Sequence, residues 1–134
     1  MPSPESLLSP EQRAALARGA HEQVAAELAS AGHPSAAGWV LEQIWDFLGA
    51  HGHYLAAAQP LDALRCALEA GRPDLLDHTL TVLEQRPRHE RDAAVTMLGR
   101  RARHEEAARL LAADDADPSA RAKALLRAGD RLGA

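Results

Sequence analysis

The chain has 134 residues and a formal net charge of −4, a length typical of one domain. It contains 30 alanines and 20 leucines but only five valine and isoleucine residues. Because alanine and leucine are strong helix formers and β-branched residues favour strands, this composition predicts an all-α protein. An acidic chain also lacks the concentrated basic surface that phosphate binding requires, so we expect no nucleic-acid binding.

The features that report on cellular location favour the cytoplasm. Cys66 is the only cysteine, so no intrachain disulfide can form, as expected in a reducing compartment. The opening stretch, MPSPESLLSPEQR, carries neither the basic nor the apolar segment of a secretory signal, and no apolar run is as long as a membrane-spanning helix. Lys123 is the only lysine beside 14 arginines, which indicates a GC-rich, bacterial genome. We therefore expect a cytoplasmic protein that does not bind membranes.

The first predicted elements are a loose tail over residues 1–8 and a helix over residues 9–31. The tail combines prolines and serines with few apolar anchors. Ser9 can cap the helix, and Gln12 completes a capping box. Gly32 suits the left-handed position that follows a helix.

A second helix is predicted over residues 35–50, after Pro34. It contains the stretch WVLEQIWDFL, whose apolar residues cover one broad arc of the helical wheel: Val40, Leu41, Ile44, Phe47 and Leu48. Trp39 and Trp45 flank this arc. Because so little of the helix is polar, we expect it to be the central core element with both tryptophans in the core. Residues 49–53, GAHGH, are expected to break it.

The rest of the chain predicts further helices joined by short connections. They cover residues 60–71, the segment between Pro73 and Pro87, and residues 88–101, 103–114 and 118–131. Connections this short are typical of antiparallel neighbours. We therefore predict six to seven helices arranged as antiparallel hairpins in a short right-handed α-solenoid. The helical domain would span residues 9–134, with aromatic-core helices over 9–58 and repeat-like helix pairs over 59–134.

Two segments resemble units of the tetratricopeptide repeat. In the first, Ala102 takes the small position and His104 replaces the aromatic residue of the family pattern. Ala107 is the contact alanine, Leu111 fills the next large position and Pro118 closes the unit. The second is WDFLG at residues 45–49, followed by Tyr54 and Ala63, with spacings stretched by two residues and with Pro60 interrupting it. The resemblance covers about residues 45–134. It implies a scaffold that binds peptides or domains on a concave face.

The candidate partner-binding residues are mainly arginines between residues 86 and 103. The group comprises Arg86, Arg88, Arg91, Arg100, Arg101 and Arg103. Arginine forks hold carboxylates well, so an acidic peptide could dock there; the alternative is a solvated surface with internal ion pairs. Trp39 or Trp45, if exposed, would be the natural hot spot. We predict a non-enzymatic protein–protein interaction module with a protein or peptide partner.

Other candidate functional residues have plain structural alternatives. His51 and His53 could contribute to a metal site, but no further ligands at a suitable spacing are apparent, so we predict no metal or other cofactor. Cys66 lies among leucines at helical spacing, as a buried thiol does, and no catalytic motif occurs, so we predict no enzyme activity. The alternative function is a compact helical bundle that blocks a single target. Leucines in the last predicted helix could support self-association.

Overall fold

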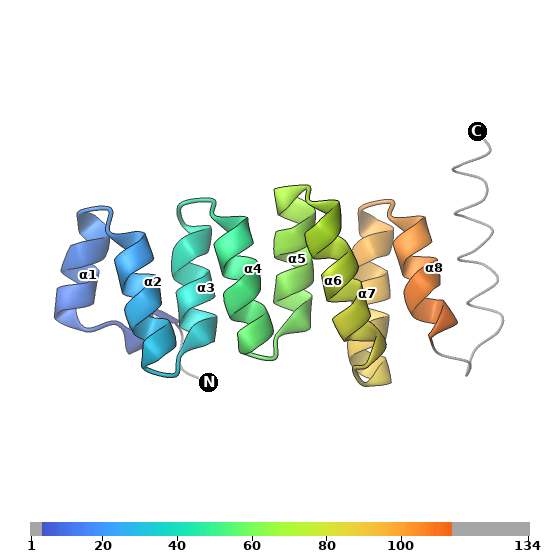
Figure 1. Cartoon of the computed structure of the whole chain (residues 1–134), viewed down its shortest axis with the longest axis horizontal. Coiled ribbons are helices and arrows are strands. Elements are labelled where there is room, and N and C mark those ends of the chain that lie inside the picture. The colour runs from blue at the N-terminus through green and yellow to red at the C-terminus, as the bar shows by residue number, and fades with distance from the viewer. Residues whose placement is uncertain (1–3, 114–134) are drawn as a thin grey trace. The chain divides into compact units, whose positions relative to one another are not determined.

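The computed structural model describes residues 4–113, which form an all-helical structure without strands (Figure 1). After a short 3₁₀-helix, η1 (Pro4–Leu7), eight α-helices follow in this part of the chain. They are α1 (Pro10–Ala17), α2 (His21–Ser30), α3 (Pro34–Glu42), α4 (Phe47–Ala56), α5 (Pro60–Ala70), α6 (Pro73–Glu84), α7 (Arg88–Arg100) and α8 (His104–Ala112). The all-α prediction is confirmed for these residues.

The chain divides into two compact units, an N-terminal unit up to Leu76 and a C-terminal unit from Asp77. In the N-terminal unit contacts run between consecutive helices, from α1 and α2 through α4 and α5, and η1 also contacts α3. Successive helices of this unit run in opposite directions, so their connecting turns alternate between two ends (Figure 1). In the C-terminal unit α7 packs against α8.

Several predicted helix ends are confirmed because they depend on local chemistry. Ser9 caps α1 in a capping box. Gly32 and Gly71 have left-handed φ values of 87° and 64° directly after α2 and α5. Pro60 and Pro73 open α5 and α6, where the missing N–H of proline has no helical partner to lose. The bounds of α7 and α8 also agree with the predicted ones to within two residues.

Two predicted helices are each broken into two, so the predicted number of six to seven was too low. The helix expected over residues 9–31 stops after Ala17, and Gly19 turns the chain with φ 85°. The helix expected over residues 35–50 stops after Glu42. There Asp46 begins a new helix by accepting a 3.0 Å hydrogen bond from the Gly49 N–H.

The break expected at residues 49–53 was also wrong, because those residues lie inside α4. The capping aspartate just before α4 offsets the poor helix propensity of the two glycines in GAHGH. A Cβ at Gly49 would lie 2.7 Å from Oδ2 of Asp46 and 2.8 Å from Cδ1 of Leu41, so a larger residue there would displace these two side chains.

The turns of the N-terminal unit are evenly spaced along the sequence. A left-handed residue occupies each one, at Gly19, Gly32, Trp45, Ala58 and Gly71. The separation from one of these residues to the next is constant, and we call it the turn interval. The helices that follow begin two residues later, at His21, Pro34, Phe47, Pro60 and Pro73. One helix and one turn therefore form the repeating structural unit.

Backbone hydrogen bonds show that the first four of these turns share one geometry, which recurs at the α7–α8 turn around Ala102. The N–H after the left-handed residue donates to the carbonyl five residues before it, as His33 does to Leu28 at 2.8 Å and Asp46 to Leu41 at 3.0 Å. This is the Schellman motif, which satisfies carbonyl groups left open at a helix end. The same bond is present after α1, α4 and α7.

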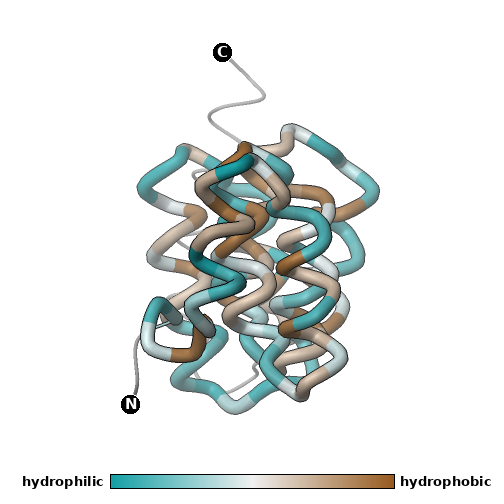
Figure 2. Tube along the Cα trace, turned by 90° about the vertical axis from the view of Figure 1, so that its left-hand side faces the viewer, coloured by the Kyte–Doolittle hydropathy of each residue, from teal (hydrophilic) through white to brown (hydrophobic). Residues whose placement is uncertain are grey.

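The turn interval also governs which side chains are buried. Three residues after each helix start lie Val24, Ala37, Ala50, Ala63 and Leu76, all buried. Seven residues after each start lie Leu28, Leu41, Tyr54, Ala67 and Leu80, also buried. Positions four residues apart share one face of a helix, so each helix turns a short apolar stripe inward. Apolar and polar stretches alternate along the trace accordingly (Figure 2).

In the C-terminal unit one arginine connects α8 to α6. Arg109 donates to the Asp77 carboxylate at 2.7 Å, to the Glu84 carboxylate at 3.0 Å and to the Thr81 hydroxyl at 2.9 Å. A guanidinium group can satisfy several acceptors at once because its donors lie in a fixed plane. Arg109 therefore fixes α8 along the second half of α6.

Two predictions concern the ends of the chain. Within the predicted loose tail, Pro4–Leu7 forms a 3₁₀-helix, and Leu7 and Leu8 pack against the hydrophobic core. The helix predicted over residues 118–131, with its self-association surface, and the closing Pro118 of the tetratricopeptide-like segment lie outside the described residues.

Candidate functional site

Trp45 is the most exposed large apolar residue in the part of the chain that the structure describes. Its exposed fraction is 78%, so the prediction that it belongs to the core was wrong. It follows α3 in the left-handed region with φ 62°, in the position that the other turns fill with glycine or alanine. In this conformation a residue with a Cβ lowers the stability of the folded protein by roughly 1–2 kcal/mol. A bulky side chain held outward in a costly conformation suggests a role other than folding.

Three neighbours extend the apolar surface around Trp45. Ile44 is 39% exposed and Leu48 is 51% exposed, although both were predicted to face the core. Phe47 is half-buried, and its ring meets the Trp45 ring edge to face, with centroids 5.9 Å apart and planes at 85°. The predicted arc fails here because the chain turns at residues 43–46, so only Val40 and Leu41 of that arc are buried.

An open pocket of about 260 Å³ lies beside Trp45. It is lined by two aromatic and three charged residues: Glu42, Trp45, Phe47, Arg65 and Glu69. Together with the exposed Ile44 and Leu48, these residues form what we call the Trp45 surface. It belongs entirely to the N-terminal unit.

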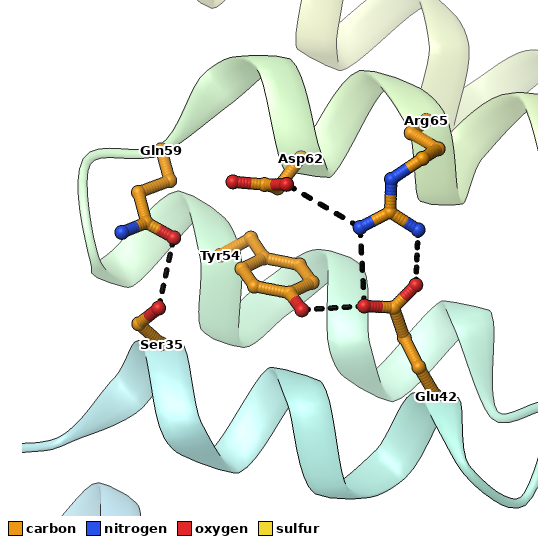
Figure 3. A network of polar contacts seen from close by, with 6 residues as sticks. All are labelled: Ser35, Glu42, Tyr54, Gln59, Asp62 and Arg65. Carbon is orange, nitrogen blue, oxygen red and sulfur yellow. Dashed lines mark hydrogen bonds and ion pairs between the residues drawn. The ribbon is translucent and has the colours of Figure 1, made fainter. Parts of the chain in front are cut away.

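A polar network fixes one wall of the pocket and joins three consecutive helices (Figure 3). Glu42 lies at the end of α3, and Arg65 from α5 donates to both of its carboxylate oxygens, with Nη2 3.1 Å from Oε2. The Tyr54 hydroxyl from α4 donates to the same carboxylate. Arg65 Nη2 also lies 3.3 Å from Asp62 Oδ1. At the other end of these helices, the Ser35 hydroxyl donates to the side chain of Gln59 at 2.9 Å.

Protonation equilibria in the network follow from burial and charge. Burial opposes ionisation of Glu42, but hydrogen bonds from Arg65 and Tyr54 outweigh it and hold the pKa of Glu42 below its ordinary value. Burial and the Glu42 carboxylate raise the pKa of Tyr54, so its hydroxyl stays a donor. The hydrogen bond to Glu42 raises the pKa of Arg65. The network is therefore a carboxylate and a guanidinium, both charged, with one neutral phenol.

Gly38 makes room for the network. A Cβ at Gly38 would lie 3.0 Å from Cζ of the Tyr54 ring, which is closer than side-chain atoms normally approach. The absence of a side chain at Gly38 therefore lets the ring lie close against α3. The ring is also near Arg65, whose guanidinium carbon is 6.0 Å from the ring centroid.

The network was not predicted from the sequence. Glu42, Tyr54 and Arg65 are well separated along the chain, so no local motif brings them together. The regular turn interval is the signal that could have found them, because it places residues separated by about that interval on neighbouring helices.

The six candidate arginines do not form one group. Three of them, Arg86, Arg88 and Arg91, precede α7 or lie in its first turn, and the other three, Arg100, Arg101 and Arg103, surround its C-terminal end. A helix of 13 residues is roughly 20 Å long, so the two sets lie at opposite ends of it.

Internal ion pairs occupy several of these arginines. Arg86 donates to Glu90 at 2.5 and 3.0 Å, which also keeps the pKa of Glu90 below its ordinary value through that hydrogen bond. The pairs Arg88–Asp92 and Arg103–Glu106 have distances of 3.7 and 3.4 Å. These contacts favour the solvated, internally paired alternative for Arg86, Arg88 and Arg103. Arg100 and Arg101 are exposed.

The remaining candidate residues occupy ordinary structural positions. Trp39 is half-buried and packs against the core. Cys66 is fully buried, and burial together with the nearby Glu42 charge raises the pKa of its thiol to about 12. His51 is buried in α4, and His53 is half-buried two residues later. Within residues 4–113 no three His, Cys, Asp or Glu side chains are grouped as a metal site requires.

None of the helices within residues 4–113 combines the length and apolar character that crossing a membrane requires. No protein-family model, curated protein or solved structure matches the chain. What the chain does must therefore be inferred from the chemistry of the Trp45 surface.

Proposed function

We propose that this protein is a non-enzymatic interaction module that uses the Trp45 surface to bind a protein or peptide partner. The observation that carries this proposal is the exposed Trp45 in a left-handed turn. Folding alone would favour glycine there, and the structurally equivalent turns contain glycine or alanine. An exposed tryptophan beside a pocket can supply a large share of binding energy when a partner covers it.

We further propose that the N-terminal unit is a short α-solenoid. Its helices contact mainly the helices next to them in sequence, and their turns and buried positions repeat at the turn interval. Repetition with nearest-neighbour packing is typical of solenoids and does not favour the alternative of a compact bundle. A helix pair with its turns, as from Gly19 to Ile44, is shorter than the roughly 34 residues of a tetratricopeptide unit. The proposed scaffold therefore resembles tetratricopeptide proteins in architecture but has a shorter unit.

A capture experiment tests the proposed function. The full-length protein and its Trp45→Gly and Ala58→Gly variants are immobilised and exposed to lysate of the source organism. Bound proteins are then quantified by mass spectrometry. Ala58→Gly is the matched control, because it introduces the same residue in the equivalent position of the next turn without removing an exposed ring. We expect a specific partner to bind the wild type and Ala58→Gly and to be depleted at least about tenfold on Trp45→Gly.

A third variant tests the other candidate surface. Reversing both exposed charges with Arg100→Glu and Arg101→Glu leaves the Trp45 surface intact. If the partner binds through the Trp45 surface, this variant should still capture it. Equal capture by the wild type and Trp45→Gly, with loss on the double charge reversal, would contradict the proposal and indicate the arginines instead.

A further inference from the structure

We propose that the pocket beside Trp45 receives a lysine or arginine side chain of the partner. This inference rests on the proposed function and adds the chemistry of the partner. The partner segment would place its cationic group against the Trp45 ring and the carboxylates that surround it.

The charges around the pocket favour a cation. Three carboxylates, those of Glu42, Asp62 and Glu69, lie in or next to the pocket, against the single guanidinium of Arg65. Figure 3 shows Arg65 between Glu42 and Asp62, and it contacts both carboxylates. The formal charge of these four groups is −2, and the lowered pKa of Glu42 keeps that carboxylate ionised. An acidic side chain entering the pocket would be repelled.

The aromatic residues favour the same ligand. Trp45 and Phe47 stand at 85° to each other, so one ring presents its edge to the face of the other. The face of an aromatic ring attracts cations, and tryptophan does so most strongly. The alkyl stem of lysine or arginine can also cover the exposed Leu48 and Ile44 while its head group remains near carboxylates. A purely apolar side chain would cover the rings but would not balance the negative formal charge of the groups around the pocket.

The charge of the whole unit supports this choice of partner. Residues 4–76 contain nine acidic and four basic side chains, a formal charge of −5. An acidic surface of this kind steers basic segments towards it and repels acidic ones, with a strength that decreases as salt is added. A basic partner segment is therefore favoured before contact as well as in the pocket.

Selection of peptides from a random library tests the inference directly. The probe is a library of random dodecapeptides displayed on phage, selected in parallel on the full-length wild type, Trp45→Gly and Ala58→Gly. We expect peptides that bind the wild type and Ala58→Gly but not Trp45→Gly to carry lysine or arginine at one fixed position. Circular dichroism melting of each variant confirms that it is folded.

Measurements on one synthetic peptide from the selection then test the role of charge. Replacing its fixed basic residue with norleucine, which keeps the alkyl stem, should weaken binding at least about tenfold. Glu69→Gln should weaken binding about fivefold, as expected for one charge pair close to the surface, and should reduce the dependence of affinity on salt. Glu22→Gln, at an exposed site outside the pocket, is the matched control and should leave affinity unchanged.

The possible failures are distinguishable. Trp45-dependent peptides with an apolar or acidic residue at the fixed position would overturn the inference about a cation and leave the proposed function standing. Selections that give the same peptides on the wild type and on Trp45→Gly would overturn both. Dimerisation in analytical ultracentrifugation that is abolished by Trp45→Gly would identify a second copy of the chain as the occupant and would also overturn the inference.

Discussion

Trp45 and Ala58 occupy the same position in two consecutive turns of the N-terminal unit, with φ values of 62° and 57°. Both come shortly after a helix, and after each the next N–H closes a Schellman hydrogen bond. The backbone requirement at the two sites is therefore the same, while the side chains differ in size and in exposed apolar area. This equivalence allows the folding role of the position to be separated from its proposed binding role.

Ala58→Gly is expected to stabilise the protein. Glycine reaches the left-handed region without the steric cost of a Cβ, so the free energy of unfolding should rise by about 1 kcal/mol. For a chain of this length, that corresponds to a melting temperature higher by roughly 4 °C. Gly19→Ala should have the opposite effect, since Gly19 has φ 85° and open space around it. A lower melting temperature for Ala58→Gly in calorimetry would contradict the assigned turn geometry.

Trp45→Gly is expected to leave stability unchanged or to raise it by up to about 1 kcal/mol. Relief of the left-handed strain offsets the loss of the edge-to-face contact with Phe47. Removal of a core tryptophan typically lowers the free energy of unfolding by about 3–5 kcal/mol, so urea unfolding distinguishes an exposed Trp45 from a buried one. A loss of that size would place Trp45 in the core and would remove the basis of the proposed function.

Gly38→Ala should destabilise the protein, whereas Gly52→Ala should not. A methyl group at Gly38 would meet the Tyr54 ring at 3.0 Å, and crowding of this kind costs about 1–3 kcal/mol. Gly52 also lies within a helix, but a Cβ there meets nothing within 4 Å, so alanine should stabilise α4 by roughly 0.5–1 kcal/mol. Equal effects of the two substitutions in chemical denaturation would show that the Tyr54 ring does not lie across α3.

The contribution of Glu42 to stability should depend on pH. Its folded-state pKa is lower than the ordinary value of 4.5, because hydrogen bonds from Arg65 and Tyr54 outweigh the effect of burial. The stabilisation is therefore complete above pH 4.5 and is lost as pH falls through the lower folded-state pKa. Glu42→Gln should be less stable than the wild type at pH 7, by about 1–2 kcal/mol, since it leaves Arg65 without its main partner.

The difference between wild type and Glu42→Gln should shrink as the solution is acidified. Urea unfolding of both proteins between pH 7 and pH 3 provides the measurement, with Glu22→Gln as a control at an exposed site. A difference that stays constant over this range would show that the charge of Glu42 does not contribute to folding.

Cys66 is expected to be unreactive in the folded protein. Its side chain is fully buried and its pKa is raised to about 12 by burial and by the Glu42 charge, so the thiolate is scarce at neutral pH. Alkylation by iodoacetamide at pH 8 should be at least about a hundredfold slower than in concentrated guanidinium, because reaction requires unfolding. Rapid alkylation under native conditions would contradict the position of Cys66 in the core.

Local chemistry allowed the helical class and several helix ends to be predicted from the sequence alone. Alanine and leucine content determines the preference for helix over strand. Four residues mark helix boundaries: Gly32, Gly71, Pro60 and Pro73. The conformational freedom of glycine and the conformational restriction of proline each act within a few residues. The capping box at Ser9 is equally local, and all five are confirmed.

Tertiary packing decided the site. The stretch WVLEQIWDFL has the apolar periodicity of a continuous helix, and nothing within it excludes one. The chain turns there because the regular turn interval lets α3 and α4 pack their alanine and leucine stripes on each other, and this burial outweighs the left-handed strain at Trp45. That turn puts Trp45 on the surface and brings Glu42, Tyr54 and Arg65 together from three helices. Such contacts depend on long-range packing free energy, which a local sequence pattern does not contain.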